Sequence, residues 1–204
     1  MGTLLKLGMA TILLAAAPGG QGAQEFDPTG WTTVEKYPAI GDARAKRVPG
    51  SRLTVVWTEF PPNVRTEGPN SNLVQTLTMH SLMYESLIQI HPETEEFIPC
   101  LASHWKIETD EKAGRQTFTF RINPKARWAD GAAVTAEDVK ASWWHRTQED
   151  RKDPMTRMTY FEDYEEPVVV DKSVIQVTTK ELNWRLFLYF GGMTIYPASE
   201  CRIP

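Results

Sequence analysis

The sequence lacks a long run of basic residues, and it lacks a hydrophobic run long enough to cross a bilayer. Its 204 residues contain 22 Lys and Arg against 26 Asp and Glu, which gives a formal net charge of −4. Without a basic stripe the chain cannot neutralise many phosphate groups, so we expect no nucleic-acid partner. The apolar run from Leu7 to Ala17 spans about 11 residues, whereas a membrane-spanning helix needs about 20.

This short apolar run has the layout of a secretory signal. Lys6 precedes the run and small residues follow it, so residues 1–23 are predicted to be a signal peptide that is cleaved near Gly22 or Ala23. The length of the run disfavours the alternative, a membrane anchor. The region contains no cysteine that could carry an acyl anchor. We therefore expect a periplasmic or extracellular protein that is secreted and not lipid-anchored.

Cysteine and histidine are scarce as well. Cys100 and Cys201 are the only two cysteines, and either a disulfide between them or two buried thiols would fit an exported chain. The four histidines show no HxH, HxxxH or HExxH spacing. The sequence therefore predicts no metal site and no cofactor.

The first part of the chain combines irregular and periodic segments. Residues 24–50 are polar and broken by Pro and Gly, which predicts an extended arm or linker, and residues 52–57 (RLTVVW) predict a short buried strand. Ser71 is predicted to cap a helix over residues 72–90. His80 on this helix is expected to be hydrogen-bonded or partly exposed rather than a ligand. The face expected to pack into the core carries Leu73, Leu77, Tyr84 and Leu87 or Ile88.

Beyond Pro92 the hydrophobic period changes from helical to alternating. In QTFTFRI, residues 118, 120 and 122 are apolar and their neighbours polar, which predicts a half-buried strand. HWKIE should pair with it across a turn at residues 110–114. PVVVDKSVIQVTT predicts a second hairpin with Asp171 and Lys172 in the turn.

The stretch RWADGAAVTAEDVKASW, residues 127–143, concentrates carboxylates beside aromatic residues. Asp130, Glu137 and Asp138 could act as the acid and base of an exported carbohydrate hydrolase. However, two carboxylates in one helical turn point in different directions near solvent, which disfavours a pair with widely separated pKa values.

The same stretch fits a turn followed by a helix. Asp130 and Gly131 supply the turn, because glycine adopts positive φ at little cost. Thr135 and Asp138 have the spacing of a capping box, and acidic residues in the first turn favour the helix dipole. Trp143 lies one helical turn after Val139, so the pair should pack onto the sheet. We therefore interpret these carboxylates as structural.

Several ordered motifs together resemble one family. YESL at residue 84, IPCLASHW at residue 98, FTFRI at residue 118 and the stretch at 127–143 are similar to the N-terminal part of the family 5 extracellular solute-binding proteins. These proteins are the oligopeptide and dipeptide receptors of ABC importers. The resemblance covers about residues 52–200. One departure is Cys100, which replaces a small residue and should affect packing rather than a ligand.

The resemblance implies an α/β fold, the first lobe of a periplasmic binding protein of type II, cluster C, with the second lobe absent. Residues 51–90 and 180–204 would form parts of this lobe, and residues 91–179 its strand-rich subdomain. Family members are much longer than this chain. The alternative that the chain is a truncated fragment without autonomous function therefore stays open.

The resemblance also implies a function, which is binding a peptide or another small molecule and delivering it to the membrane permease of an ABC importer. A receptor of this kind needs no cofactor, is expected to be a monomer and is not an enzyme. The ligand-binding residues that it implies are Thr58, Glu59 and Phe60, after the first strand, and Trp184. Glu59 could pair with a ligand ammonium group and Phe60 could form an apolar wall. The alternatives are a solvated loop and, at Trp184, a packed aromatic side chain.

Overall fold

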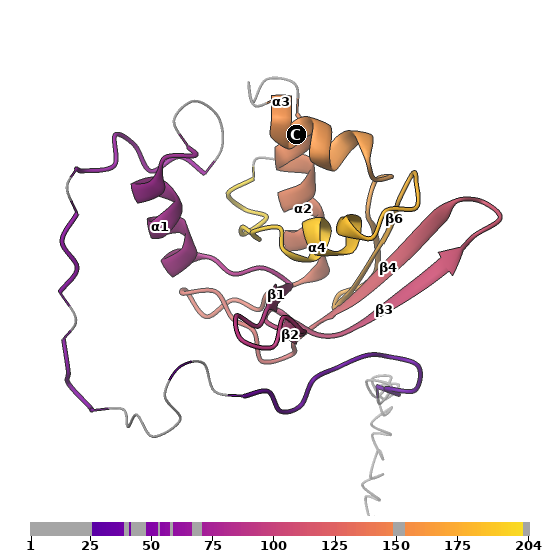
Figure 1. Cartoon of the computed structure of the whole chain (residues 1–204), viewed down its shortest axis with the longest axis horizontal. Coiled ribbons are helices and arrows are strands. Elements are labelled where there is room, and N and C mark those ends of the chain that lie inside the picture. The colour runs from indigo at the N-terminus through magenta and orange to yellow at the C-terminus, as the bar shows by residue number, and fades with distance from the viewer. Residues whose placement is uncertain are drawn as a thin grey trace, which may run out of the picture.

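The structure is a computed structural model, and it describes residues 26–38, 41, 48–52, 54–57, 59–66, 71–148 and 154–201. Figure 1 shows a body of sheet and helices, with a long extended segment running beside it to α1 (Val74–Met83). The remaining helices are α2 (Ala136–Thr147), α3 (Pro154–Arg157), which continues into the π-helical turn η2 (Met158–Glu162), and α4 (Arg185–Gly191).

The main sheet is built from two antiparallel hairpins. Its four strands are β3 (Ala102–Asp110), β4 (Arg115–Ile122), β5 (Val168–Asp171) and β6 (Val174–Thr178), in the order β3-β4-β6-β5. Every neighbouring pair is antiparallel. Both predicted hairpins are confirmed. In the first turn the Asp110 carboxylate accepts hydrogen bonds from the N–H groups of Lys112 and Ala113, at 3.1 and 3.0 Å.

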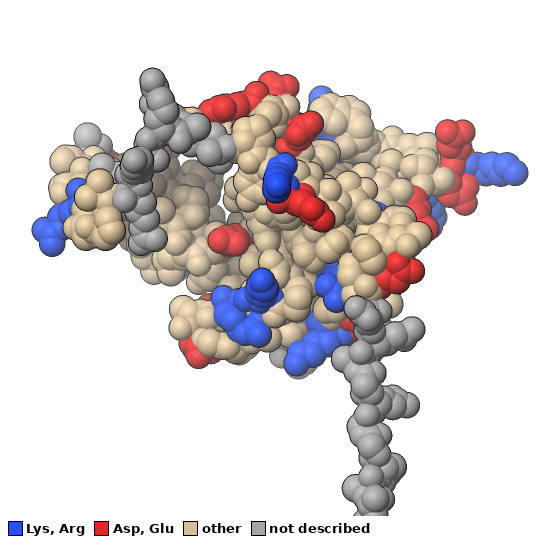
Figure 2. Space-filling model, turned by 90° about the horizontal axis from the view of Figure 1, so that it is seen from below, with Lys and Arg blue, Asp and Glu red and all other residues tan. Residues whose placement is uncertain are grey.

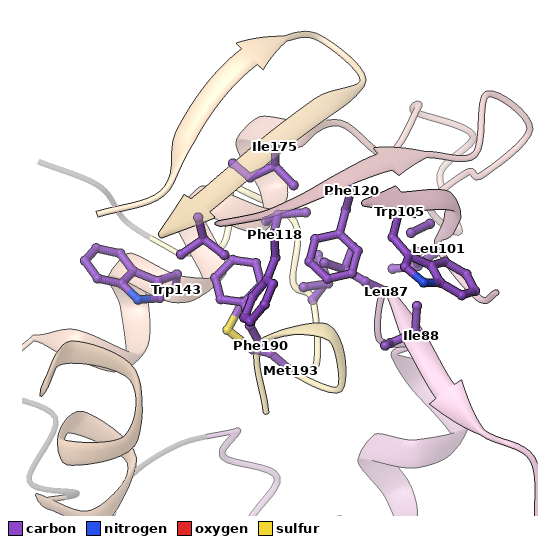
Figure 3. Close-up of a cluster of buried hydrophobic side chains, with 14 of the residues drawn as sticks. Leu87, Ile88, Leu101, Trp105, Phe118, Phe120, Trp143, Ile175, Phe190 and Met193 are labelled. Atoms are coloured by element: carbon purple, nitrogen blue, oxygen red, sulfur yellow. The ribbon is translucent and has the colours of Figure 1, made fainter. Parts of the chain in front are cut away.

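The core lies between one face of this sheet and the helices. Phe118 and Phe120 of β4 are fully buried, as the alternating pattern predicted. Phe187 of α4 stacks on Phe120 with ring centroids 5.4 Å apart, and Phe190 lies 5.9 Å from the same ring. Figure 3 shows this aromatic cluster with Trp143 of α2 at one end and Trp105 of β3 at the other. Through this cluster α2 and α4 pack against the sheet.

A smaller sheet connects α1 to this core. Its two antiparallel strands are β1 (Ile88–Ile90) and β2 (Phe97–Pro99). The carbonyl of Leu87 accepts hydrogen bonds from the N–H groups of Cys100 and Ala102, at 3.1 and 2.9 Å. Leu87 and Ile88 are both fully buried.

Gly191, at the end of α4, packs directly against β1. A Cβ atom at this position would lie 2.6 Å from Cγ1 and 2.7 Å from Cδ1 of the buried Ile88. We expect Gly191→Ala to lower the free energy of unfolding by about 1–2 kcal/mol, because the close-packed core has little room for the extra methyl group. Urea denaturation measures this loss. In an Ile88→Ala background, which removes both contacted atoms, the same substitution should cost much less, and an equal cost in both backgrounds would contradict this explanation.

The predicted strand at residues 52–57 is wrong for the residues that the structure describes. Residues 54–57 have no strand assignment, and Val56 is 86% exposed. A strand requires a hydrogen-bonded neighbour, and the strands of both sheets pair with one another rather than with this segment. Its β-branched composition is therefore not sufficient to bury it.

The predicted helix over residues 72–90 is too long. Helix α1 ends at Met83, Tyr84 already has extended backbone angles, and Leu73 rather than Ser71 stands at the N-cap. The predicted core face is wrong within α1, because Leu73 and Leu77 are 37% and 52% exposed, whereas Leu87 and Ile88 are buried as predicted. Residues 88–90 form β1 instead, because their backbone pairs with β2 and the Ile88 side chain packs against Gly191 of α4. The buried residues of α1 are Thr76 and His80, and His80 contacts the Val64 carbonyl at 3.4 Å, as expected for a histidine without a ligand role.

The described part of the predicted N-terminal arm is extended and contacts the edge of β3. Thr32 and Trp105 exchange two backbone hydrogen bonds of 2.8 and 3.0 Å. Phe26 lies with its ring 3.8 Å from the guanidinium carbon of Arg121 and 4.9 Å from the ring of His104. The pKa of His104 is lowered, first because burial disfavours its charged form and second because Arg121 is nearby. The arm thus covers part of an edge strand. The domain boundaries themselves stay predictions.

Candidate functional site

The loop after Trp57 forms a small pocket in an exposed segment. Val55, Trp57, Glu59 and Phe60 line a cavity of about 320 Å³. Phe60 is 94% exposed and Glu59 is exposed, so both side chains are accessible to a ligand. Thr58 lies outside the described residues. Glu59 and Phe60 therefore line one pocket, and its described walls all come from a single segment. Their role as ligand contacts stays a prediction.

Trp184 does not line this pocket. It precedes α4, and its side chain is 76% exposed, so the alternative of a packed aromatic residue is wrong. The Arg185 guanidinium carbon lies 5.4 Å from the centroid of a Trp184 ring. In Figure 1 the extended segment before α1 lies on the left, well separated from α4. Within this chain Trp184 is thus an exposed aromatic residue apart from the binding loop.

Asp130 and Asp138 serve as structural groups. Asp130 accepts a hydrogen bond of 2.8 Å from the Ala132 N–H, in the turn where Gly131 has a φ of +88°. Asp138 accepts two hydrogen bonds from Thr135, 2.7 Å from its N–H and 3.0 Å from its hydroxyl group. Glu137 is exposed beside them. The predicted turn and helix cap are therefore confirmed.

The helix that follows this cap packs as predicted. Val139 is fully buried and Trp143 is 5% exposed. The indole N–H of Trp143 donates a 2.7 Å hydrogen bond to the Tyr160 carbonyl, which ties α2 to η2. The 127–143 stretch thus provides a turn, a cap and a packing face.

A second pocket was not predicted from the sequence. It has a volume of about 690 Å³, and its described walls come from three segments that are far apart in the chain, residues 82–84, 128–138 and 197–200. Residues 128–138 and Tyr84 belong to motifs of the family resemblance, but nothing in the sequence marks residues 82–84 or 197–200 as neighbours of the 128–138 segment. No sequence signal could have brought these three segments together.

Neither a metal centre nor a membrane-spanning helix occurs in the described part of the chain. There, no group of three or more His, Cys, Asp and Glu side chains is placed to hold a metal ion. Of the described helices, none combines the length and apolar character that crossing a membrane requires. On the face shown in Figure 2, acidic and basic side chains form small separate groups rather than one patch of a single sign.

The two cysteines are present as thiols and form no disulfide with each other. Cys201 is buried, and Cys100 is partly buried. Burial, and secondly the nearby Glu85 carboxylate, raise the pKa of Cys100 to about 11.

This raised pKa predicts a slow reaction of Cys100 with alkylating agents. Because the thiolate is the nucleophile, iodoacetamide at pH 8 should modify Cys100 about a hundredfold more slowly than an unperturbed thiol of pKa near 9. The rate should rise about tenfold for each pH unit up to about pH 11. Mass spectrometry of a Cys201→Ser variant, in which Cys100 is the remaining thiol, measures the rate of alkylation. A rate that levels off near pH 9 would contradict the raised pKa.

Comparison with known proteins identifies the family. Residues 96–200 match the family model described as bacterial extracellular solute-binding proteins, family 5 middle. The match covers more than half of the chain. The chain belongs to this family. The family model describes extracellular solute-binding proteins.

Relatives within family 5 include peptide-binding proteins. The dipeptide-binding protein DppE of Bacillus subtilis is 27% identical over 118 residues, which is 58% of this chain and 21% of that protein. The periplasmic murein peptide-binding protein MppA of Escherichia coli is 34% identical over 61 residues, 30% of this chain and 10% of that protein. The chain thus matches only about a fifth or less of the length of these relatives.

A solved structure supports the fold. NikA of Brucella suis, in complex with Fe(III)-EDTA, aligns with a TM-score of 0.54 and 16% identity over 70% of this chain and 27% of that one. The likeness confirms the predicted α/β fold of a type II periplasmic binding protein.

Proposed function

We propose that the chain is the exported solute-binding component of an ABC importer and that it binds peptides. The observation that carries this proposal is the family 5 match of residues 96–200. Peptide is favoured as the solute because the two curated relatives are named as dipeptide-binding and murein peptide-binding proteins. The signal-like residues 1–23 favour a periplasmic or extracellular location, and transfer to a membrane permease follows from the role of such receptors.

The loop after Trp57 is the proposed contact with the ligand. The exposed Glu59 carboxylate can accept hydrogen bonds from the N-terminal ammonium group of a peptide, and charge-assisted bonds of this kind are stronger than neutral ones. The exposed Phe60 ring can cover an apolar side chain. Thr58 lies between Trp57 and Glu59 in this proposed loop, and Trp184 is proposed as a more distant contact.

Thermal-shift screening tests the receptor role. The purified chain should gain melting temperature with a member of a peptide library, because a ligand that binds only the folded state stabilises it. Opine, sugar and nickel libraries are screened in parallel. A larger shift with one of these libraries would replace the peptide assignment, and no shift with any library would overturn the receptor role.

Glu59→Gln tests the proposed ammonium contact. We expect the dissociation constant of the dipeptide Ala-Phe, measured by isothermal titration calorimetry, to rise about three- to fivefold, the range for an exposed ion pair. The N-acetylated dipeptide, which lacks the ammonium group, should bind the variant and the unchanged chain equally. Glu108→Gln, at an exposed position of β3, is the matched control and should change neither value. An equal effect of both substitutions would place the peptide elsewhere.

A further inference from the structure

The unpredicted pocket lies where α1, the 128–133 turn, the start of α2 and the 197–200 turn meet. Its volume of about 690 Å³ falls within the range of about 300–1,000 Å³ that small-molecule sites occupy. It shares no lining residue with the pocket of the loop after Trp57. It is therefore separate from the proposed peptide contact.

Asp138 accepts hydrogen bonds from three of these walls. Besides the two hydrogen bonds from Thr135, its carboxylate accepts a 2.8 Å hydrogen bond from the Ala198 N–H, within the 197–200 turn, and a 3.4 Å hydrogen bond from the indole N–H of Trp128. The carboxylate itself is buried. Because these contacts lie within the protein, these walls are held in place before a ligand binds, which reduces the cost of ordering on binding.

The surface of the pocket is largely apolar and aromatic. Leu82 and Met83, at the end of α1, are 82% and 61% exposed. The side chains of Tyr84 and Trp128 complete this surface. Tyr84 is held by Tyr196, whose ring meets it edge to face at a centroid distance of 4.9 Å. These residues offer contact area to an apolar group.

The described charged residues that line the pocket are acidic. Asp130, Asp138 and Glu200 are among them, and within the described part of the chain no Lys or Arg lines the pocket. Burial, and then the carboxylate of Glu200, raise the pKa of Tyr84, which places negative charge beside this ring. The faces of aromatic rings attract cations as well. Charge and ring chemistry therefore both favour a positively charged ligand.

We propose that this pocket binds small organic ammonium ions that carry an aromatic or aliphatic group. The ammonium group lies near Glu200 and the ring of Trp128, and the apolar group packs on Leu82 and Met83. This is a second binding site, beyond the proposed peptide contact.

Titration with three probes of similar shape tests the charge preference. The purified chain is titrated by calorimetry with 2-phenylethylamine, 2-phenylethanol and phenylacetate, which are cationic, neutral and anionic. We expect the amine to bind at least tenfold more tightly than the alcohol, and phenylacetate to bind more weakly than the alcohol. Equal binding of all three, or no binding at millimolar concentration, would overturn the proposal.

Leu82→Lys tests the location of the site. It places a cation at the pocket and should weaken 2-phenylethylamine binding about tenfold, while the folded state is maintained because the side chain is largely exposed. The matched control is Leu77→Lys, which changes an exposed residue of the same helix that does not line the pocket and should leave the affinity unchanged. Equal weakening by both variants would show nonspecific charge repulsion and overturn the site.

Competition separates this site from the proposed peptide contact. Saturating N-acetylated Ala-Phe, which lacks the ammonium group that the pocket would bind, should leave the affinity for 2-phenylethylamine unchanged. Displacement of the amine by the dipeptide would overturn the claim of a second site. If Ala-Phe does not bind at all while the amine binds as expected, the peptide proposal fails and the ammonium pocket stands.

Discussion

Phe120→Ala is expected to lower the free energy of unfolding by about 3–5 kcal/mol. Phe120 is fully buried, and it stacks on Phe187 and packs beside Phe190 of α4. Removing the ring leaves a cavity between sheet and helix, which the close-packed surroundings fill only in part, so the lost transfer free energy and the cavity term add. Since domains are stable by only about 5–15 kcal/mol, this variant should unfold at a much lower urea concentration.

The matched control is Phe60→Ala, which deletes the same ring at a position that is 94% exposed. We expect it to change the free energy of unfolding by no more than about 0.5 kcal/mol. Equilibrium urea unfolding followed by tryptophan fluorescence measures both variants. A large loss for Phe60→Ala would show that its ring is buried in solution, and a small loss for Phe120→Ala would contradict the arrangement of α4 on β4.

The features that were predicted correctly depend on local chemistry. The alternation around Phe118 and Phe120 follows from the two-residue period of a strand that has one buried face. The turn at Gly131 and the cap at Thr135 each require only residues within three or four positions of one another. Such signals are contained within a short window of sequence, so the structures that they predict do not depend on distant parts of the chain.

The features that were predicted wrongly depend on distant partners. Residues 54–57 have strand composition, but the described sheets give them no neighbouring strand. Residues 84–90 have helical periodicity. However, pairing of β1 with β2 and packing of Ile88 against Gly191 stabilise the strand more than the local preference stabilises a helix. Intrinsic propensity differs by less than about 1 kcal/mol per residue, so tertiary packing overrides it. The described walls of the pocket beside Asp138 come from three distant segments, and these become neighbours only when the chain folds.

Asp138→Ala should lower the free energy of unfolding by about 3 kcal/mol. The substitution removes the helix cap at Thr135, for which about 1 kcal/mol is typical. It also removes the charged acceptor of the Ala198 N–H, and a hydrogen bond to a charged group contributes about 1.5–3 kcal/mol. The loss should exceed that of an ordinary cap because one carboxylate joins the start of α2 to the 197–200 turn.

Glu137→Ala provides the control, because it removes the neighbouring but exposed carboxylate. Only a favourable interaction with the helix dipole is lost, so we expect a cost of about 0.3–1 kcal/mol. Urea unfolding of both variants measures the difference between a carboxylate that joins segments and one that faces solvent. Equal losses would mean that Asp138 acts only through the charge of the first helical turn. In the sequence, Glu137 and Asp138 resemble the acid and base of an enzyme. A larger loss for Asp138→Ala would show that Asp138 is a structural group and that Glu137 is a solvated neighbour.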